Sequence, residues 1–146
     1  MKATLTFFSL LLVTVLFSPS ETLSQIQTRL RIIEASNKGS TVDPSLRDVH
    51  GQLGSLFNFT SYRLLKDENL SLSPNRPVEI PAHSAVSLEV TLIRQQKDMA
   101  EFRIKIRRQG TEILNTQVRL SPGRTVLIGG PKHGEGIAIL ALSSRF

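Results

Sequence analysis

The sequence contains no cysteine and no tryptophan, and Tyr62 is its single tyrosine. Without cysteine, the chain forms no disulfide scaffold, no thiolate metal site and no cysteine nucleophile. The scarcity of large aromatic side chains argues against a platform on which sugars or bases stack. The remaining composition is ordinary, because charged residues make up 21% and hydrophobic residues 40% of the 146 residues. These values are typical of one globular domain and argue against extensive disorder.

Long hydrophobic runs are also missing, except near the N-terminus. There an apolar run at residues 3–17 follows a positively charged start and precedes small residues, which is the pattern of a secretory signal peptide. An uncleaved membrane anchor is the alternative, but the run is shorter than the roughly 20 apolar residues that a spanning helix needs. Cleavage fits after Ser20 or Ser24, and we prefer Ser24 because a strand-like pattern begins after it. We therefore predict a signal peptide at residues 1–24 and one β-rich domain at residues 25–146, in a secreted or periplasmic protein with no transmembrane helix after cleavage.

One segment of the predicted domain has the pattern of a helix. Asp43 can cap the first free amides, and Pro44 suits the first helical position, where its missing amide costs nothing. Apolar residues then recur at helical spacing on one face, at Leu46, Val49, Leu53, Leu56 and Phe57. We predict one helix from Pro44 to Phe57, which is stable when it packs against a sheet.

The other readable segments alternate or run apolar, as strands do. Residues 25–34 have the alternation of a half-buried strand. A hairpin joined around residues 95–98 is predicted by two inward apolar rows, at Val86, Leu88, Val90, Leu92, Ala100, Phe102, Ile104 and Ile106. Residues 125–128 and 137–142 are nearly continuous apolar runs, which are typical of central strands covered on both faces. The predicted fold class is α+β, a mostly antiparallel β-sheet or sandwich with one packed helix.

The net charge of +6 is concentrated in one strand-like segment. Residues 94–108 contain six cations and two acids. Arg103, Lys105 and Arg107 have the parity opposite the apolar row, so that a strand projects them as one row with a spacing of about 7 Å. Together with Arg108, they are candidates for binding an anionic polysaccharide, a lipid surface or an acidic partner.

Two other interpretations of this basic row stay open. The row can be an ordinary solvated sheet face, with Glu89 or Glu101 as cross-strand partners. It can also guard a sheet edge against aggregation. Nucleic acid is not expected as a partner, because the protein is predicted to be exported.

A glycine-rich segment at residues 129–136 follows one of the apolar strands. It lacks the G-K-[ST] ending of a phosphate-binding loop, and a second apolar strand follows it in place of a helix. A tight hairpin is therefore predicted, with glycine allowing positive φ and Pro131 rigidifying the bend. Its residues are candidates for contacting a partner, and these are Gly129, Gly130, Pro131, Lys132 and His133.

Groups that could carry catalysis or bind a metal are sparse. His50, His83 and His133 lie far apart in the sequence, without the short spacing of metal ligands. No G-x-S-x-G nucleophile motif is present. We therefore predict no metal, no cofactor and no enzymatic activity. A small hydrolase built around His133 and Glu135 with a distant serine is the weakest of the alternatives.

Residues 123–131 read Gly-Arg-Thr-Val-Leu-Ile-Gly-Gly-Pro. This segment resembles the G-x-T-V-hydrophobic-hydrophobic-G-G strand found late in the bacterial secretin domain, from the outer-membrane channels of type II and type III secretion and of type IV pilus systems. More broadly, residues 33–37, 60–65 and 126–142 resemble segments of a family of small exported bacterial proteins that share this sequence motif. The resemblance implies a place in the cell envelope, and it transfers no catalytic residue.

The leading hypothesis is a non-enzymatic, exported binding or assembly module of the cell envelope, accessory to a secretin-like system and bound to a protein partner there. The alternative is a binder of an anionic polymer or lipid surface through the basic strand at residues 94–108.

Overall fold

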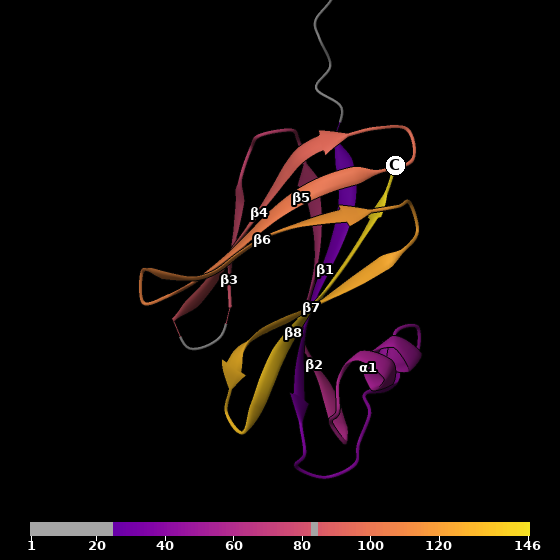
Figure 1. Ribbon diagram of the computed structural model, residues 1–146, viewed down its shortest axis with the longest axis vertical. Coiled ribbons are helices and arrows are strands. Elements are labelled where there is room, and N and C mark those ends of the chain that lie inside the picture. Colours follow the sequence, from indigo (N-terminus) through magenta and orange to yellow (C-terminus); the bar gives the residue numbers. More distant parts are fainter. Residues whose placement is uncertain (1–24, 83–84) are drawn as a thin grey trace, which may run out of the picture.

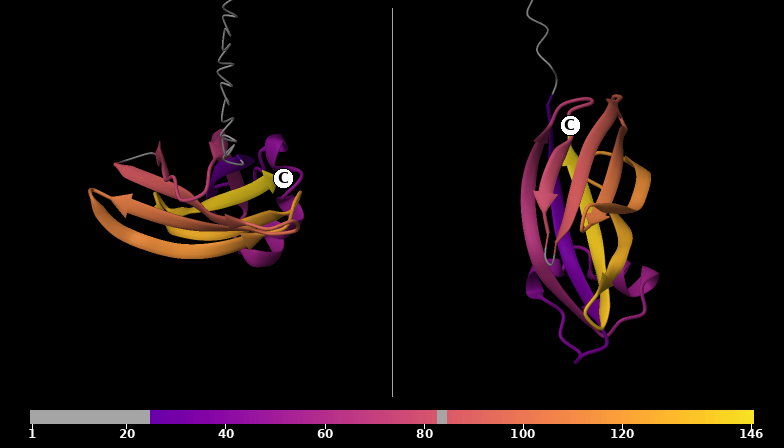
Figure 2. Two further views of the ribbon diagram at one scale, coloured as in Figure 1. Left: turned by 90° about the horizontal axis from the view of Figure 1, so that it is seen from above. Right: turned by 90° about the vertical axis from the view of Figure 1, so that its left-hand side faces the viewer.

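The fold is a sandwich of two antiparallel four-stranded sheets with short helices on one outer face (Figures 1 and 2). The computed structural model describes residues 25–82 and 85–146, so the predicted signal peptide lies outside the described residues. The first sheet has the order β2-β1-β8-β7, formed by Ser61–Leu72, Ile26–Ser36, Gly136–Arg145 and Thr125–His133. The second has the order β3-β4-β5-β6, formed by Val78–Pro81, Val86–Gln95, Ala100–Arg108 and Thr111–Leu120. The mostly antiparallel, sandwich-like arrangement agrees with the predicted fold class.

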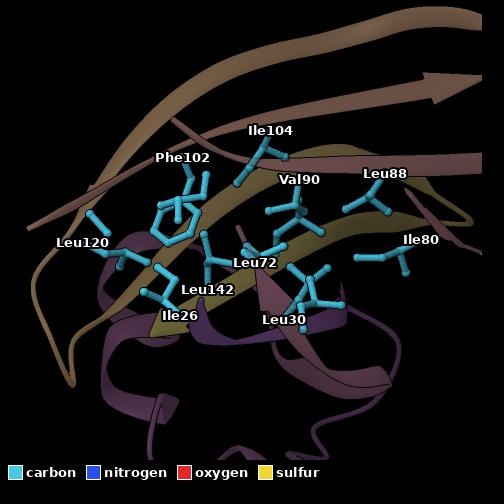
Figure 3. Close-up of a cluster of buried hydrophobic side chains, with 14 of the residues drawn as sticks. Ile26, Leu30, Leu72, Ile80, Leu88, Val90, Phe102, Ile104, Leu120 and Leu142 are labelled. Carbon is cyan, nitrogen blue, oxygen red and sulfur yellow. The ribbon is translucent and has the colours of Figure 1, made fainter. Parts of the chain in front are cut away.

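The main hydrophobic core lies between the inner faces of the two sheets (Figure 3). The predicted β4–β5 hairpin is confirmed, and its register places Val90 opposite Ile104 and Leu92 opposite Phe102. These four side chains are fully buried. They face residues of the first sheet, which include Ile26 and Leu30 of β1, Leu72 of β2 and Leu142 of β8. Alternation of apolar residues was therefore sufficient to identify this face of the second sheet.

Strand β1 is buried more completely than its alternation predicts. It lies between β2 and β8. Its polar parity is exposed at Gln27 and partly exposed at Arg29, as alternation predicts, but not at Arg31. Arg31, on that parity, is only 1% exposed. Its guanidinium donates hydrogen bonds of 2.8 Å to both carboxylate oxygens of Asp48. The prediction of a half-buried strand was wrong here, because a partner distant in sequence compensates the charge of Arg31.

The predicted helix from Pro44 to Phe57 is divided into two short helices. A 3-10 helix spans Pro44–Leu46, and α1 spans His50–Leu56. Asp43 caps the first of these, accepting a hydrogen bond of 3.0 Å from the amide of Ser45, as predicted. The prediction of one continuous helix was wrong. Val49 adopts φ −115° and ψ 0°, which interrupts the helical geometry between the 3-10 helix and α1.

The helical segment covers the outer face of the first sheet, where Figure 1 shows α1 beside β2. Leu46, Val49 and Leu53 are buried in a second, smaller cluster against that sheet. The prediction of a buried apolar face was wrong at Leu56, which is 62% exposed. Within the described part of the chain, no helix has the length and hydrophobicity needed to cross a membrane.

The two apolar C-terminal strands differ in position. Strand β8 lies between β1 and β7, and both of its faces are covered, as predicted for residues 137–142. Strand β7 is an edge strand, so the prediction of a central strand at residues 125–128 was wrong. Its apolar residues are half-buried by the sandwich core and the helical segment, although only β8 pairs with it. A continuous apolar run therefore indicates that both faces of a strand are covered. It does not indicate that the strand has a hydrogen-bonded neighbour on each side.

The glycine-rich segment forms a hairpin, but not with the predicted bend. Strand β7 continues through Pro131 to His133, with an irregular register between Gly129 and Lys132. The turn lies at Gly134, whose φ is +56°. Pro131 lies at the register irregularity of an edge strand, a position that tolerates the missing amide donor.

Candidate functional site

A groove with a volume of about 980 Å³ opens between the two sheets at one end of the sandwich. At this end the first sheet is longer than the second, and in Figure 1 the β7–β8 hairpin and the ends of β1 and β2 lie below the second sheet. The groove is lined by the inner faces of both sheets and by the β7–β8 hairpin tip. It combines an apolar floor with a basic rim.

The floor is a continuation of the main core. Ile32, Leu65 and Leu140 line it from the first sheet, and Val86, Leu88 and Ile106 line it from the second. All of these side chains are aliphatic. Leu65 and Val86 are half-buried, whereas the deeper Leu88 and Ile106 are fully buried. Ala138 is also half-buried here and presents only a methyl group to the groove.

The rim carries five basic side chains, which are Arg63, Lys66, Arg108, Lys132 and His133. Among the described residues that line the groove, none is a carboxylate. The rim residues come from β2, β5 and β7, so the topology gathers positive charge from three strands at one opening. Such a concentration of one sign of charge beside an apolar wall raises the local concentration of anionic ligands.

Two of the rim cations reach across the groove from one sheet to the other. Lys66 of β2 donates a hydrogen bond of 2.6 Å from Nζ to the carbonyl oxygen of Pro81 in β3. Arg108 of β5 donates a hydrogen bond of 3.0 Å to the carbonyl oxygen of Lys132 in β7. Both side chains line the groove, and their charged ends are held by backbone carbonyls of the opposite sheet.

The rim charges differ in how far they are neutralised. Glu34 lies 3.0 Å from an Arg63 nitrogen and 2.9 Å from Nε2 of His133. Lys66 has Glu68 at 3.6 Å. Among residues 25–82 and 85–146, neither Arg108 nor Lys132 has a carboxylate within ion-pair distance. These two cations are therefore the rim groups with charge most available to a ligand.

The predicted anion-binding residues do not form one surface. Arg103, Lys105 and Arg107 lie half-buried on the outer face of the second sheet, opposite the core. Arg107 pairs with Glu89 at 3.3 Å, which is one of the two cross-strand partners considered from the sequence. The other, Glu101, pairs with Arg94 at 2.8 Å. Much of the charge on this face is thus neutralised by its neighbours.

Arg108 is separated from that row. It is exposed at the end of β5 and meets the predicted partner-contact residues Pro131, Lys132 and His133 at the groove. The fold therefore brings one residue of the predicted anion-binding set together with three residues of the predicted partner-contact set in a single site. Arg63 and Lys66 complete it, and sequence analysis missed both because only the pairing of β2 with β1 brings them to this opening.

The remaining two members of the glycine-rich set have a packing role. A Cβ on Gly129 would lie 3.3 Å from the ring of Phe57, and one on Gly130 would lie 2.8 Å from the carbonyl oxygen of Ala138. Neither glycine lines the groove. Their small size allows β7 to approach Phe57, which follows α1, and the backbone of β8 closely.

The histidines offer little basis for a metal centre. His50 is exposed on α1, and His133 is at the groove rim, whereas His83 lies outside the described residues. No group of three histidine, aspartate or glutamate side chains in the described ranges has the geometry to hold a metal ion.

A second, polar depression is lined by Arg29 and Asp67, which pair with each other, and by Asp48, which pairs with the buried Arg31. Hydrogen bonds from Arg31 lower the pKa of Asp48, and hydrogen bonds from Arg29 lower the pKa of Asp67. The Arg29–Asp67 contacts of 2.9 and 2.6 Å join exposed side chains of β1 and β2. The charges in each pair neutralise each other, and Arg145 is the one lining cation of the depression without an ion pair among the described residues, compared with Arg108 and Lys132 at the groove.

No family model matches the chain, and no curated protein matches it. Among solved structures, the chain is similar to the T2SS secretin XcpQ from Pseudomonas aeruginosa, with a TM-score of 0.40 and 12% sequence identity. The similarity covers 83% of this chain and 55% of that one, so the chain spans about half the length of the secretin chain. This neighbour is a secretin, the class of protein that residues 123–131 resemble. Similarity this low establishes neither a shared fold nor a shared function.

Proposed function

We propose that the protein is a non-enzymatic binding module of the cell envelope that binds a negatively charged partner at the rim of the end groove. The observation that carries this proposal is the convergence of Arg63, Lys66, Arg108 and Lys132 at one opening. Two of these cations lack a carboxylate partner among the described residues. The predicted signal peptide supports the location in the envelope or outside the cell.

A second candidate surface is the basic row on the outer face of the second sheet. It is favoured by Arg103 and Lys105, for which no ion pair is present among the described residues. Both proposals predict binding to anions, but they place it on different faces of the sandwich.

Two double variants separate these surfaces, because each removes two positive charges. Arg108→Gln with Lys132→Gln alters the rim, and Arg103→Gln with Lys105→Gln alters the outer row. Retention on immobilised heparin across a salt gradient measures the charge-dependent affinity. We expect the rim pair to elute at a clearly lower salt concentration than the wild type, and the outer-row pair to elute near it. The reverse order would assign anion binding to the outer row, and equal elution of all three proteins would reject both surfaces.

The finer proposal is that the partner belongs to a secretin-like machine. It is supported by the resemblance of residues 123–131, which form the loop before β7 and most of that edge strand. Co-purification of the protein with a secretin subunit from envelope extracts tests it. Recovery that falls in the rim double variant but not in the outer-row variant would support this partner, and absence of the secretin from both preparations would count against it.

A further inference from the structure

We propose that the end groove binds a single-chain amphiphile with an anionic head group, of the fatty acid or alkyl phosphate class. This inference deepens the proposed function, because it shares the basic rim and adds the apolar floor as the site of an acyl chain. The proposed ligand is a single amphiphile molecule that inserts its acyl chain between the two sheets, and not a micelle or a membrane surface.

The floor favours an acyl chain over a peptide. Its side chains are aliphatic on both sheets: Leu65, Val86 and Ala138 are partly exposed, whereas Ile32, Leu88, Ile106 and Leu140 are buried. A peptide inserted here would bring backbone amides and carbonyls that these side chains cannot hydrogen-bond, and burial of such groups without a partner is costly. An acyl chain has no polar groups to satisfy. The volume of about 980 Å³ lies in the range of small-molecule sites, which are mostly apolar with a few placed polar groups.

The rim favours an anionic head group. Arg108 and Lys66 hold their charges at the opening by hydrogen bonds to neutral carbonyl oxygens, on Lys132 and Pro81 respectively. A carboxylate or phosphate is a stronger acceptor than a carbonyl for these donors. Lys132 is exposed beside them. A ligand head group can therefore take over these donors while their alkyl stems cover the chain.

The two parts of the ligand give separable signatures in an affinity measurement. Each methylene group buried in the floor is expected to tighten binding by about fourfold, until the floor is filled. Lengthening decanoate to dodecanoate should therefore tighten binding by roughly an order of magnitude. Loss of the head-group charge should weaken binding at every chain length.

The experiment is calorimetric titration of the folded protein with octanoate, decanoate and dodecanoate, each below its micellar concentration. Dodecyl phosphate tests the other head group, and dodecyltrimethylammonium and the methyl ester of dodecanoate test the requirement for negative charge. An acidic peptide without an acyl chain is the charge-only control. We expect affinity to increase with chain length among the three carboxylates, dodecyl phosphate to bind as well, the methyl ester to bind more weakly than dodecanoate, and binding of the cationic amphiphile to be lost.

Variants then test which residues contact the acyl chain and which contact the head group. Ala138→Leu adds bulk to the floor and should abolish the dependence on chain length. Arg108→Gln with Lys132→Gln should weaken dodecanoate by about tenfold, whereas the matched pair Arg103→Gln with Lys105→Gln should leave it unchanged. The chain-length series on the wild type does not depend on whether Ala138→Leu folds, and thermal unfolding identifies a misfolded variant.

Three results would overturn the inference. The first is affinity for anions that does not depend on chain length, which would leave the proposed anionic partner in place without an acyl site. The second is binding of acidic vesicles without uptake of any monomeric amphiphile, which would assign the rim to a membrane surface. Equal binding of dodecanoate by the wild type and the rim variant, together with unchanged heparin retention, would reject the proposed function as well.

Discussion

At the scale of single residues, the glycines of the C-terminal hairpin illustrate how similar residues have different roles. Gly134 is needed for a positive φ in the turn. Gly136 is needed for space, because a Cβ there would overlap the carbonyl oxygen of Ala35 in the neighbouring strand. Gly51 in α1 has open space around it. A glycine-rich sequence therefore does not by itself indicate a loop or a ligand.

These differences predict opposite effects of the same substitution. Gly136→Ala should lower the free energy of unfolding by about 3 kcal/mol or more, because the backbone of β1 has to move. Gly51→Ala should raise it by about 0.5–1 kcal/mol, because alanine restricts the unfolded chain and favours the helix. Urea unfolding followed by circular dichroism measures both. A Gly136→Ala protein as stable as the wild type would show that β1 and β8 approach less closely than described.

At the scale of elements, one buried arginine connects the helical segment to the sheet. The side chain of Arg31 is 2% exposed, whereas that of its partner Asp48 is 54% exposed. Removal of Asp48 would leave the guanidinium buried without its carboxylate, and such a loss is costly even though water reaches the aspartate side. The pair therefore orients the segment between the two short helices on the outer face of β1.

The lowered pKa of Asp48 gives this contact a pH dependence. A carboxylate with a lower pKa in the folded state stabilises the fold fully above its unfolded pKa of about 3.9, and this contribution is lost as the pH falls through the folded value. We expect the wild type to lose stability below about pH 4. Asp48→Asn should be less stable at neutral pH by about 1–3 kcal/mol and should depend less on pH in that window.

Asp67→Asn is the matched control for this prediction. Asp67 also has a lowered pKa, but its partner Arg29 has a side chain that is 42% exposed. Its replacement should cost less than about 1 kcal/mol at neutral pH. Urea unfolding at a series of pH values measures all three proteins. Equal losses for the two variants would contradict a special role for the burial of Arg31.

At the scale of the whole molecule, the sandwich explains how a basic opening and an apolar floor coexist. The first sheet extends past the second, so that inner-face residues emerge from the core at one end. Hydrogen bonds from Lys66 and Arg108 join the two sheets on either side of this opening. The groove is therefore a consequence of unequal sheet lengths and not of a separate loop insertion.

The predicted export of the molecule has a direct test. Intact-mass measurement of the protein recovered from outside the cytoplasm should give a species that begins at Gln25, because the small-residue pattern ends at Ser24. A species that begins at Glu21 would move the cleavage to Ser20. An exported species that retains Met1 would contradict the signal peptide.

Patterns with short periods were predicted reliably from the sequence. The inward rows of β4 and β5 and the turn between them follow from side-chain alternation. The cap at Asp43 follows from local hydrogen bonding. These features depend on residues close together in the chain, and the sequence by itself determined them.

Tertiary structure decided the features that depend on distant partners. Burial of Arg31 requires Asp48, and the edge position of β7 depends on which strands surround β8. The groove is the clearest case, because its rim combines Arg63 and Lys66 of β2 with Arg108 of β5 and Lys132 of β7. Alternation assigns a side chain to a face of its own strand, but only strand order and sheet length determine which faces meet and where they open to solvent.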